Sequence, residues 1–223
     1  MNKRRVAFIH TSPPAVGPLM QFYSEAAPEL EITNLLDDGL LRLLAAQDLA
    51  TTSGRLADML RVATEIYRAE FALVTCSSVP VEMVVELGLR VSVPLLKIDY
   101  PMAQQAVRAG RRIGVATTFP PTLGPTRRLI EAAATEAGVA VEIVEEVAPE
   151  AYDALLTGDT ARHDELLTVA VERLSQRDVA VIVLAQVSMA RTLPRLKSLI
   201  KVPVLSSLHT SLAAVRAQLE QRH

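Results

Sequence analysis

The chain has 223 residues, enough for one sizeable hydrophobic core or for two smaller α/β lobes. Half of the residues are hydrophobic and 22% are charged, which is the balance of a soluble globular protein. The formal net charge of -2 comes without a marked basic face, so the composition gives little electrostatic support for binding nucleic acid.

The chain contains one cysteine, Cys76. A single thiol can form neither an internal disulfide nor a cysteine-rich zinc site, so a reducing compartment is expected. The apolar stretch after the basic start, residues 6–9, is too short for a signal peptide. No apolar run approaches the ~18 residues that span a bilayer. We therefore expect a cytoplasmic protein without a targeting segment.

Short apolar runs alternate along the chain with longer segments of helical periodicity. In chain order we expect a strand at 6–9, a helix at 15–26, a weaker strand at 31–35, a helix at 52–69, a strand at 71–74, a helix at 79–90, a strand at 94–98, a helix at 101–109, a strand at 113–116, a helix at 124–137, a strand at 139–144, a helix at 161–175, strands at 179–185 and 202–205, and a helix at 209–221. The strands are nearly continuous in apolar character, as parallel strands covered on both faces are. The alternation predicts an α/β fold with parallel sheets and right-handed crossovers.

The chain also resembles itself at a separation of about half its length. The matching segments are residues 5–11 with 112–118, 31–32 with 142–143, 73–76 with 183–186, and 93–94 with 202–203, at offsets of 107, 111, 110 and 109. Four matches in order at a nearly constant offset predict two pseudo-symmetric lobes, each a small parallel sheet flanked by helices. We place one lobe at residues 1–99, with the C-terminal helix 208–223 packing back on it, and the other at 100–207.

Ligands of open parallel sheets bind at the carboxyl ends of the strands. With two such sheets, we expect the site in the cleft between the lobes. The four loops expected to line it are residues 10–14, 76–79, 117–121 and 186–189.

Cys76 ends one of the expected strands and precedes a helix. The positive end of a helix dipole favours the thiolate form of a thiol, and Pro80 suits a first helical turn, which tolerates a missing N–H. Ser77, Ser78 and free backbone N–H groups could hold a carboxylate there. Lone cysteines are commonly inert and buried. The position at a strand end, among polar neighbours, favours a functional thiol instead.

The turn Thr75-Cys76-Ser77-Ser78 resembles the first cysteine motif of the aspartate/glutamate/hydantoin racemase superfamily. Residues 184–190, Leu-Ala-Gln-Val-Ser-Met-Ala, resemble its second motif, and residues 9–13, 97–99 and 114–118 also fit. The resemblance covers essentially the whole chain.

This resemblance implies two pseudo-symmetric α/β lobes and an enzyme that needs no cofactor. In the racemases of the superfamily, a cysteine from each lobe faces the α-carbon of the substrate. One cysteine removes the proton, and the other delivers a proton to the opposite face. Backbone N–H groups and hydroxyls hold the substrate carboxylate, which implies binding roles for Thr11, Ser12, Ser77, Ser78, Thr117, Thr118, Val187 and Ser188.

Gln186 occupies the second cysteine position of that pattern. An amide neither takes nor gives a proton near neutral pH, so a symmetric two-thiol racemase is not expected. Its N–H groups can donate hydrogen bonds to an oxyanion and so stabilise an enolate. We expect Cys76 to transfer the proton. A one-base racemase would need another group, such as a water molecule or His10, for the second face.

Two other reactions suit a single thiol. It can protonate the enediolate left by decarboxylation, as in the arylmalonate decarboxylase branch of the superfamily, where the cysteine lies in the other lobe. It can also add to an activated double bond and permit cis–trans isomerisation, as in the maleate isomerase branch. A non-catalytic protein that binds small carboxylates is the alternative from a different class.

Other signals in the sequence are weaker. Asp159, His163 and Asp164 superficially suggest a metal site, but Asp159 before a helical segment is more simply an N-cap, so no metal is expected. No Gly-rich phosphate loop follows a strand, which argues against a nucleotide enzyme. We expect a small carboxylate as the partner, with neither nucleic acid nor membrane, and a homodimer is possible for a chain of this size.

Overall fold

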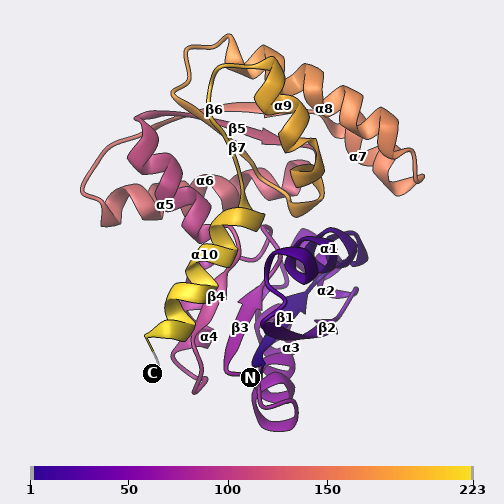
Figure 1. Cartoon of the computed structure of the whole chain (residues 1–223), viewed down its shortest axis with the longest axis vertical. Coiled ribbons are helices and arrows are strands. Elements are labelled where there is room, and N and C mark those ends of the chain that lie inside the picture. The colour runs from indigo at the N-terminus through magenta and orange to yellow at the C-terminus, as the bar shows by residue number, and fades with distance from the viewer. Residues whose placement is uncertain (1–2, 222–223) are drawn as a thin grey trace. The chain divides into compact units, whose positions relative to one another are not determined.

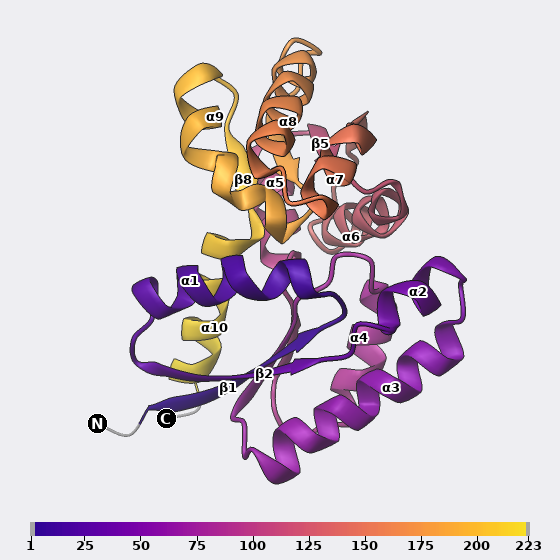
Figure 2. The same ribbon diagram turned by 90° about the vertical axis from the view of Figure 1, so that its right-hand side faces the viewer.

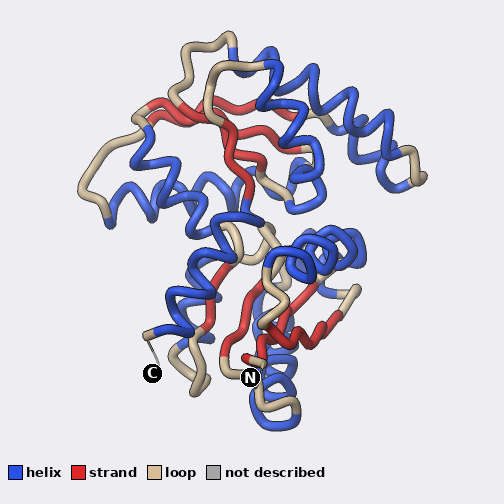
Figure 3. The backbone as a smooth tube through the Cα atoms, in the orientation of Figure 1, coloured by secondary structure: helices blue, strands red, loops and turns tan. Residues whose placement is uncertain are grey.

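The computed structural model describes residues 3–221 and contains two four-stranded parallel sheets flanked by helices (Figure 1; Figure 3). The chain divides into two compact units. One takes in the residues up to Ile98 together with those from Leu208 onward, and the other is Asp99–Ser207. The predicted α/β class with two lobes of parallel strands is confirmed.

The first unit is built on the sheet β2-β1-β3-β4. Its elements are β1 (Arg4–His10), the 3-10 turn η1 (Pro13–Ala15), α1 (Val16–Ala26), β2 (Leu30–Leu36), α2 (Leu40–Ala45), α3 (Leu49–Arg61), the π turn η2 (Val62–Ile66), β3 (Phe71–Val74), α4 (Val81–Gly88), β4 (Leu95–Lys97) and the C-terminal helix α10 (Ser207–Glu220).

Helices cover both faces of the first sheet. Ala7 and Ile9 of β1 belong to a buried cluster with residues of α2, α3 and α4. Phe8 between them points to the other face because side chains alternate along a strand, and its ring lies 4.9 Å from that of Tyr23 in α1, centroid to centroid. A buried hydrogen bond of 2.9 Å joins the hydroxyls of Tyr23 and Ser211, so α10 packs beside α1. Figure 2 shows α1 and α3 on the two sides of β1 and β2.

The second unit is built on the sheet β6-β5-β7-β8. Its elements are α5 (Tyr100–Ala109), β5 (Arg112–Thr117), the 3-10 turn η3 (Pro120–Thr122), α6 (Leu123–Glu136), β6 (Glu142–Val147), α7 (Pro149–Leu156), α8 (Thr160–Ser175), β7 (Val181–Leu184), the 3-10 segment η4 (Val187–Thr192), α9 (Leu193–Leu199) and β8 (Val204–Ser206).

The second sheet is likewise covered on both faces. Ala116, Ile182 and Leu184 pack into one buried cluster with α8, η4 and α9. Val115 and Val183 point to the opposite face, where α6 contacts β5 and α5 contacts β7. Full burial on both faces explains why these strands read as continuous apolar runs.

The two sheets repeat one another in strand order and in register. The first strand of each unit lies between the second and the third, and the fourth strand completes the edge. Equivalent residues also have equivalent neighbours, at the offsets found by comparing the sequence with itself. The corresponding sets of paired residues are Val6, Ile32 and Phe71 in the first sheet and Ile113, Ile143 and Val181 in the second.

Helix caps follow the same repeat. Asp48 caps α3 by accepting a hydrogen bond from the backbone N–H of Thr51 at 3.1 Å. Asp159 caps α8 by accepting one from the N–H of Arg162 at 3.0 Å. An acceptor at this position satisfies one of the donors that a helix leaves unpaired at its start. The N-cap interpretation of Asp159 is therefore confirmed.

Some predicted boundaries differ from those observed. The strand expected at 139–144 begins only at Glu142, because Gly138 ends the preceding helix with a φ of 66° and the next three residues form the connection. The helix expected at 52–69 begins at Leu49 and ends at Arg61, where η2 takes over. Three helices were not predicted: α2, α7 and α9 have six, eight and seven residues, too few for a periodicity that needs a window of 11 or more.

Within residues 3–221, no helix is both long enough and apolar enough to cross a membrane.

Candidate active site

Three adjacent strands of the first unit end in polar or reactive side chains. His10 is the last residue of β1, Lys97 is the last residue of β4, and Cys76 lies two residues beyond β3. Because β1, β3 and β4 are neighbours in one parallel sheet, their carboxyl ends share an edge. The structure thus brings His10, Cys76 and their loops to one end of this unit.

The chain after Cys76 forms a turn, not the start of a helix. The N–H of Val79 donates to the carbonyl of Cys76 at 3.4 Å, and α4 begins only at Val81, with Pro80 as its N-cap. The expectation that Cys76 lies at a helix N-terminus is therefore wrong. Pro80 adopts a φ of -58° and a ψ of 140°, which is extended and not helical, so the helix begins at the next residue. The field of a helix dipole falls off within one turn, so it contributes little at this sulfur.

Cys76 is a free, half-buried thiol between buried neighbours on either side. Its side chain packs against the cluster that includes Ala7 and Ile9, and no hydrogen bond to its Sγ is made within residues 3–221. The residue is thus partly exposed, with an apolar cluster on one side and the polar residues Thr75, Ser77 and Ser78 next to it in the chain.

Three hydroxyls near this strand end lack a protein partner in the part of the chain that the structure describes. Thr11 is 1% exposed, and its Oγ1 is buried without a hydrogen bond. Ser77 and Ser78 are 7% and 8% exposed and make no side-chain hydrogen bond. A buried hydroxyl normally finds a partner, and Thr11 Oγ1 is buried without one. Thr11 and the two serines are therefore suited to bind polar atoms of a ligand.

His10 is fully buried, and both of its ring nitrogens are engaged. Nε2 lies 2.8 Å from Oδ1 of Asn34, and Nδ1 lies 2.8 Å from Oγ1 of Thr75. An amide oxygen only accepts, so Nε2 carries the proton. The Thr75 hydroxyl also lies 3.1 Å from the carbonyl of Ile9, so its single proton can serve either that oxygen or Nδ1. Burial lowers the pKa of His10, and the hydrogen bond to Asn34 partly offsets this. A neutral ring in this tautomer satisfies both bonds, an arrangement that suits positioning β1 against β2 and β3.

Lys97 is a buried polar group at this edge that ties the sheet to the loop of Cys76. Its side chain is 2% exposed, and its Nζ donates to the backbone carbonyl of Ser77 at 3.3 Å. A buried ammonium group needs hydrogen-bonded partners. The bond ties β4 to the loop that carries Cys76. Asn34, Thr75 and this role of Lys97 were missed because a strand pattern does not show which distant residues a polar side chain meets.

The corresponding edge of the second unit is built around Gln186. This residue follows β7, and Thr117, Thr118 and Phe119 follow or end the adjacent β5. The Oε1 atom of Gln186 accepts hydrogen bonds from Thr118 N at 2.8 Å, Thr117 Oγ1 at 3.0 Å, Thr118 Oγ1 at 3.0 Å and Phe119 N at 3.1 Å. We call these four donors the oxygen cradle. Sequence reasoning had placed Thr117 and Thr118 at the site, but it did not show that Gln186 binds them.

The rest of the second motif lies in η4. Val187 and Ser188 are buried there, and the N–H of Met189 donates to the carbonyl of Gln186 at 3.2 Å. Gln186 is half-buried while residues on both sides are buried. Cys76 shows the same pattern in the first unit.

The sequence matches the model of the Asp/Glu/Hydantoin racemase family over residues 32–215, most of its length. The chain belongs to the Asp/Glu/hydantoin racemase family. No curated protein matches the chain in sequence.

Several solved structures share its fold. Glutamate racemase isoform RacE1 from Bacillus anthracis is 14% identical with a TM-score of 0.76, and the match covers 100% of this chain and 84% of that one. Allantoin racemase from Klebsiella pneumoniae is 18% identical with a TM-score of 0.74, covering 98% and 89% of the two chains. Arylmalonate decarboxylase is 16% identical with a TM-score of 0.63, covering 96% and 92%. At these identities the likeness shows the fold alone.

In this racemase-family chain, a charged cluster joins η4, which carries most of the second motif, to α8. Arg191 in η4 donates from Nε to Oδ1 of Asp164 at 2.8 Å and from Nη2 to the carbonyl of Thr160 at 3.1 Å. His163 lies 2.8 Å from the same Asp164 oxygen through its Nδ1. Burial lowers the pKa of His163, the bond to Asp164 raises it, and the charge of Arg191 lowers it. No group of three or more His, Cys, Asp or Glu among residues 3–221 is arranged to hold a metal ion.

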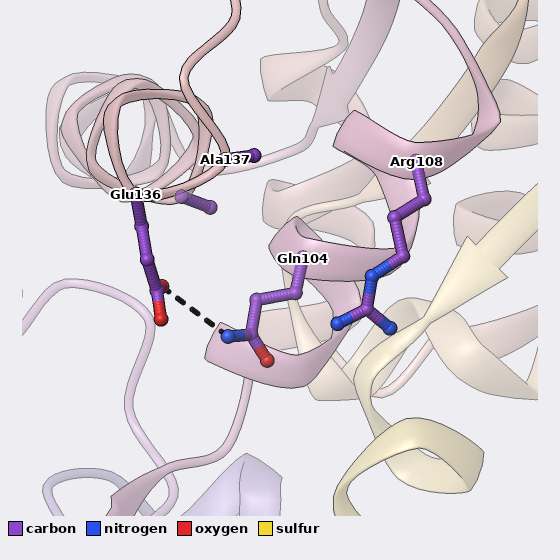
Figure 4. Close-up of a pocket in the computed structure, with 5 residues that line it drawn as sticks. Gln104, Arg108, Glu136 and Ala137 are labelled. Atoms are coloured by element: carbon purple, nitrogen blue, oxygen red, sulfur yellow. Dashed lines mark hydrogen bonds between the residues drawn. The ribbon is translucent and has the colours of Figure 1, made fainter.

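A surface pocket of this family member lies between α5 and α6, and none of its lining residues belongs to the two motifs (Figure 4). Gln104 donates from Nε2 to Oε2 of Glu136 at 3.3 Å, and the Tyr100 hydroxyl donates to the same oxygen. Burial and the neighbouring Glu136 raise the pKa of Tyr100 to about 12. Because its carboxylate is already paired and no strand end reaches it, this pocket is not the candidate active site.

Proposed function

We propose that this chain is a cofactor-independent enzyme of the racemase family that acts at the α-carbon of a small carboxylate or amino-acid-like substrate by proton transfer through Cys76. The observation that carries the proposal is the setting of Cys76. The only thiol of the chain belongs to a half-buried residue at the carboxyl end of a sheet, near Thr11, Ser77 and Ser78, whose hydroxyls make no hydrogen bond within residues 3–221.

The proposed step is a proton transfer between carbon and sulfur. The thiolate of Cys76 takes the α-proton, so the C–H bond breaks, an S–H bond forms, and the electron pair moves into the adjacent carboxyl group as an enediolate. Hydroxyl and N–H donors stabilise the negative charge that develops on oxygen. Returning the proton to carbon regenerates the thiolate. Gln186 serves as one of the donors, and Thr117, Thr118, Val187 and Ser188 are the candidate binding residues of the second unit.

His10 has a positioning role in this proposal. Its two ring nitrogens are already bonded to Asn34 and Thr75, and its ring is fully buried. A group that takes the proton on the second face would need a free nitrogen. Cys76 is therefore the one acid–base group that we assign to the reaction.

Decarboxylation is the second candidate, and the setting of Gln186 favours it. A racemase needs protons to be exchanged on both faces of the carbon, whereas protonation after loss of CO2 needs one thiol only. With the acceptor end of Gln186 bound in the oxygen cradle, the second motif offers donors and no base. In that reaction the C–C bond breaks, CO2 leaves, and Cys76 delivers its proton to the enediolate carbon.

One assay separates these reactions. Wild type and Cys76→Ala are incubated in D2O with aspartate, glutamate, allantoin, phenylmalonate and maleate, and the products are followed by NMR. Deuterium at the α-carbon with inversion indicates racemisation, and CO2 release indicates decarboxylation. Either signal should fall by at least about 10³-fold in Cys76→Ala, because the reacting group is absent. Turnover that survives in Cys76→Ala, or an inert wild type that still binds a carboxylate, would contradict the proposal.

A further inference from the structure

The orientation of the Gln186 side chain is fixed by its neighbours. Two of its four hydrogen-bond partners are the backbone N–H groups of Thr118 and Phe119, at 2.8 and 3.1 Å. A backbone N–H can only donate, so the atom facing both groups must be the amide oxygen. The NH2 group of Gln186 consequently points away from the oxygen cradle.

The two ends of the Gln186 amide differ sharply in their bonding. Four donors surround Oε1, although an amide oxygen has only two lone pairs. Thr117 Oγ1 also lies 3.1 Å from the carbonyl of Phe119, so its single proton can serve either acceptor. The Nε2 atom, by contrast, donates to no protein group within residues 3–221, although the residue is half-buried.

We propose that Gln186 is a specificity-determining residue, whose amide is locked by the oxygen cradle so that its NH2 group is presented as a fixed donor to a ligand oxygen. The proposal rests on the proposed function, which makes the ligand a carboxylate. The group facing Gln186 is then a carboxylate or enolate oxygen, which accepts hydrogen bonds, and not an ammonium group, which only donates. Positioned donors lose little entropy on binding, so a locked amide selects more sharply than a mobile one.

The first unit lacks such a lock at the equivalent position. Cys76 takes the place of Gln186 in the repeat, and no hydrogen bond to its sulfur is made in the described part of the chain. Thr11, which matches Thr118 in the repeat, has an unpaired buried hydroxyl, whereas Thr118 Oγ1 donates to Gln186. The lock therefore belongs to the second motif alone.

The acceptor half of the proposal can be tested without a ligand, by amide hydrogen exchange of Thr118 and Phe119. Gln186→Glu keeps an oxygen in the cradle, so both amides should stay as protected as in wild type. Gln186→Met has a similar length but no acceptor, so the Thr118 amide should exchange roughly three- to tenfold faster, as expected for the loss of one net hydrogen bond. The Phe119 amide should change less, because its N–H also donates to Thr117 Oγ1 at 3.2 Å. Equal protection in all three proteins would overturn the lock.

The donor half is tested with malonate, phenylmalonate and glutamate as probes, in titrations followed by 1H–15N NMR. The side-chain NH2 signal of Gln186 is the one that disappears in Gln186→Glu. We expect at least one probe to shift it while the Thr118 and Phe119 amides stay in place, and to bind Gln186→Glu more than about tenfold less tightly. Large shifts of the two backbone amides would mean that the probe displaces Gln186, and no shift of the NH2 signal with any probe would mean that it is not a ligand donor. Either result would overturn the proposal.

A matched pair of variants isolates the oxygen cradle. Thr118→Val removes one donor to Oε1, whereas Thr126→Val removes a buried hydroxyl of α6 that has no partner within residues 3–221. Only Thr118→Val should broaden or shift the Gln186 NH2 signal and weaken probe binding. An equal effect of Thr126→Val would point to general loosening of the unit and contradict the assignment.

Cys76→Ala separates this inference from the proposed function. The NH2 shift on adding a probe should persist in that variant, because the oxygen cradle lies wholly in the second unit. If the NH2 shift persists but wild type shows no turnover, the proposed role of Gln186 stands and only the proposed chemistry is refuted. If wild type shows turnover but the Gln186 NH2 signal does not respond to any probe, the proposed chemistry stands and the role of Gln186 is refuted.

Discussion

Cys76 and Gln186 take corresponding positions in the two repeats, and the chemistry that we propose depends on the difference between them. A thiol can hold or release a proton near neutral pH, whereas an amide can only donate and accept hydrogen bonds. The structure adds that the amide oxygen is already bound by four donors. At the scale of single residues, one position is therefore suited to proton transfer and the other to holding charge.

Two buried histidines make the stability of the fold depend on pH. Burial lowers the pKa of His10 and of His163 below the value of about 6.5 that each has in the unfolded chain. Below that pH the unfolded chain binds protons that the folded chain does not, so the free energy of unfolding decreases as pH falls. The decrease is at most about 1.4 kcal/mol per pH unit for each histidine, and it ends at the folded pKa.

Urea unfolding between pH 7.5 and 5 measures this dependence. His163→Gln and His10→Gln should each flatten the slope, although each also lowers stability at pH 7.5 by removing buried hydrogen bonds. If neither buried variant changed the slope, the histidines would not be neutral in the folded state as we infer.

At the scale of elements, strands were predicted better than helices. The apolar runs of β1, β3 and β5 are buried on both faces, so local sequence and tertiary environment agree there. The short helix α7 begins with Pro149, and α9 has Pro194 in its first turn. Both helices are stabilised by packing, which no local pattern shows. The site loops were located from strand ends alone. The oxygen cradle was not, because it depends on contacts between residues about 68 positions apart.

Two glycines give opposite predictions for the elements that contain or border them. A Cβ at Gly110, between α5 and β5, would lie 2.3 Å from the Cβ of Ala180, just before β7. Gly110→Ala should therefore lower the free energy of unfolding by roughly 1–3 kcal/mol. A Cβ at Gly54 in the middle of α3 meets nothing within 4 Å, so Gly54→Ala should raise it by about 0.5–1 kcal/mol. Urea unfolding followed by circular dichroism checks both signs, and a neutral Gly110→Ala would show that β7 can move away.

At the scale of the whole molecule, the repeat was the most informative sequence signal. Offsets of 107 to 111 in the sequence reappear as identical strand order and register in the two sheets. The match to the racemase family over residues 32–215 agrees with it. The reaction could not be predicted to the same extent, because a fold shared by racemases and a decarboxylase leaves the chemistry to a few side chains.

The central claim is that Cys76 is a reactive thiol, and its alkylation by iodoacetamide tests this most directly. The chain has one cysteine, so a single mass shift reports on that residue alone. We expect native protein at pH 7 to be alkylated without unfolding, because Cys76 is only half-buried and lies at a strand end. A native thiol that stays unmodified until the protein unfolds would contradict the account, because Cys76 would then be an inert core residue.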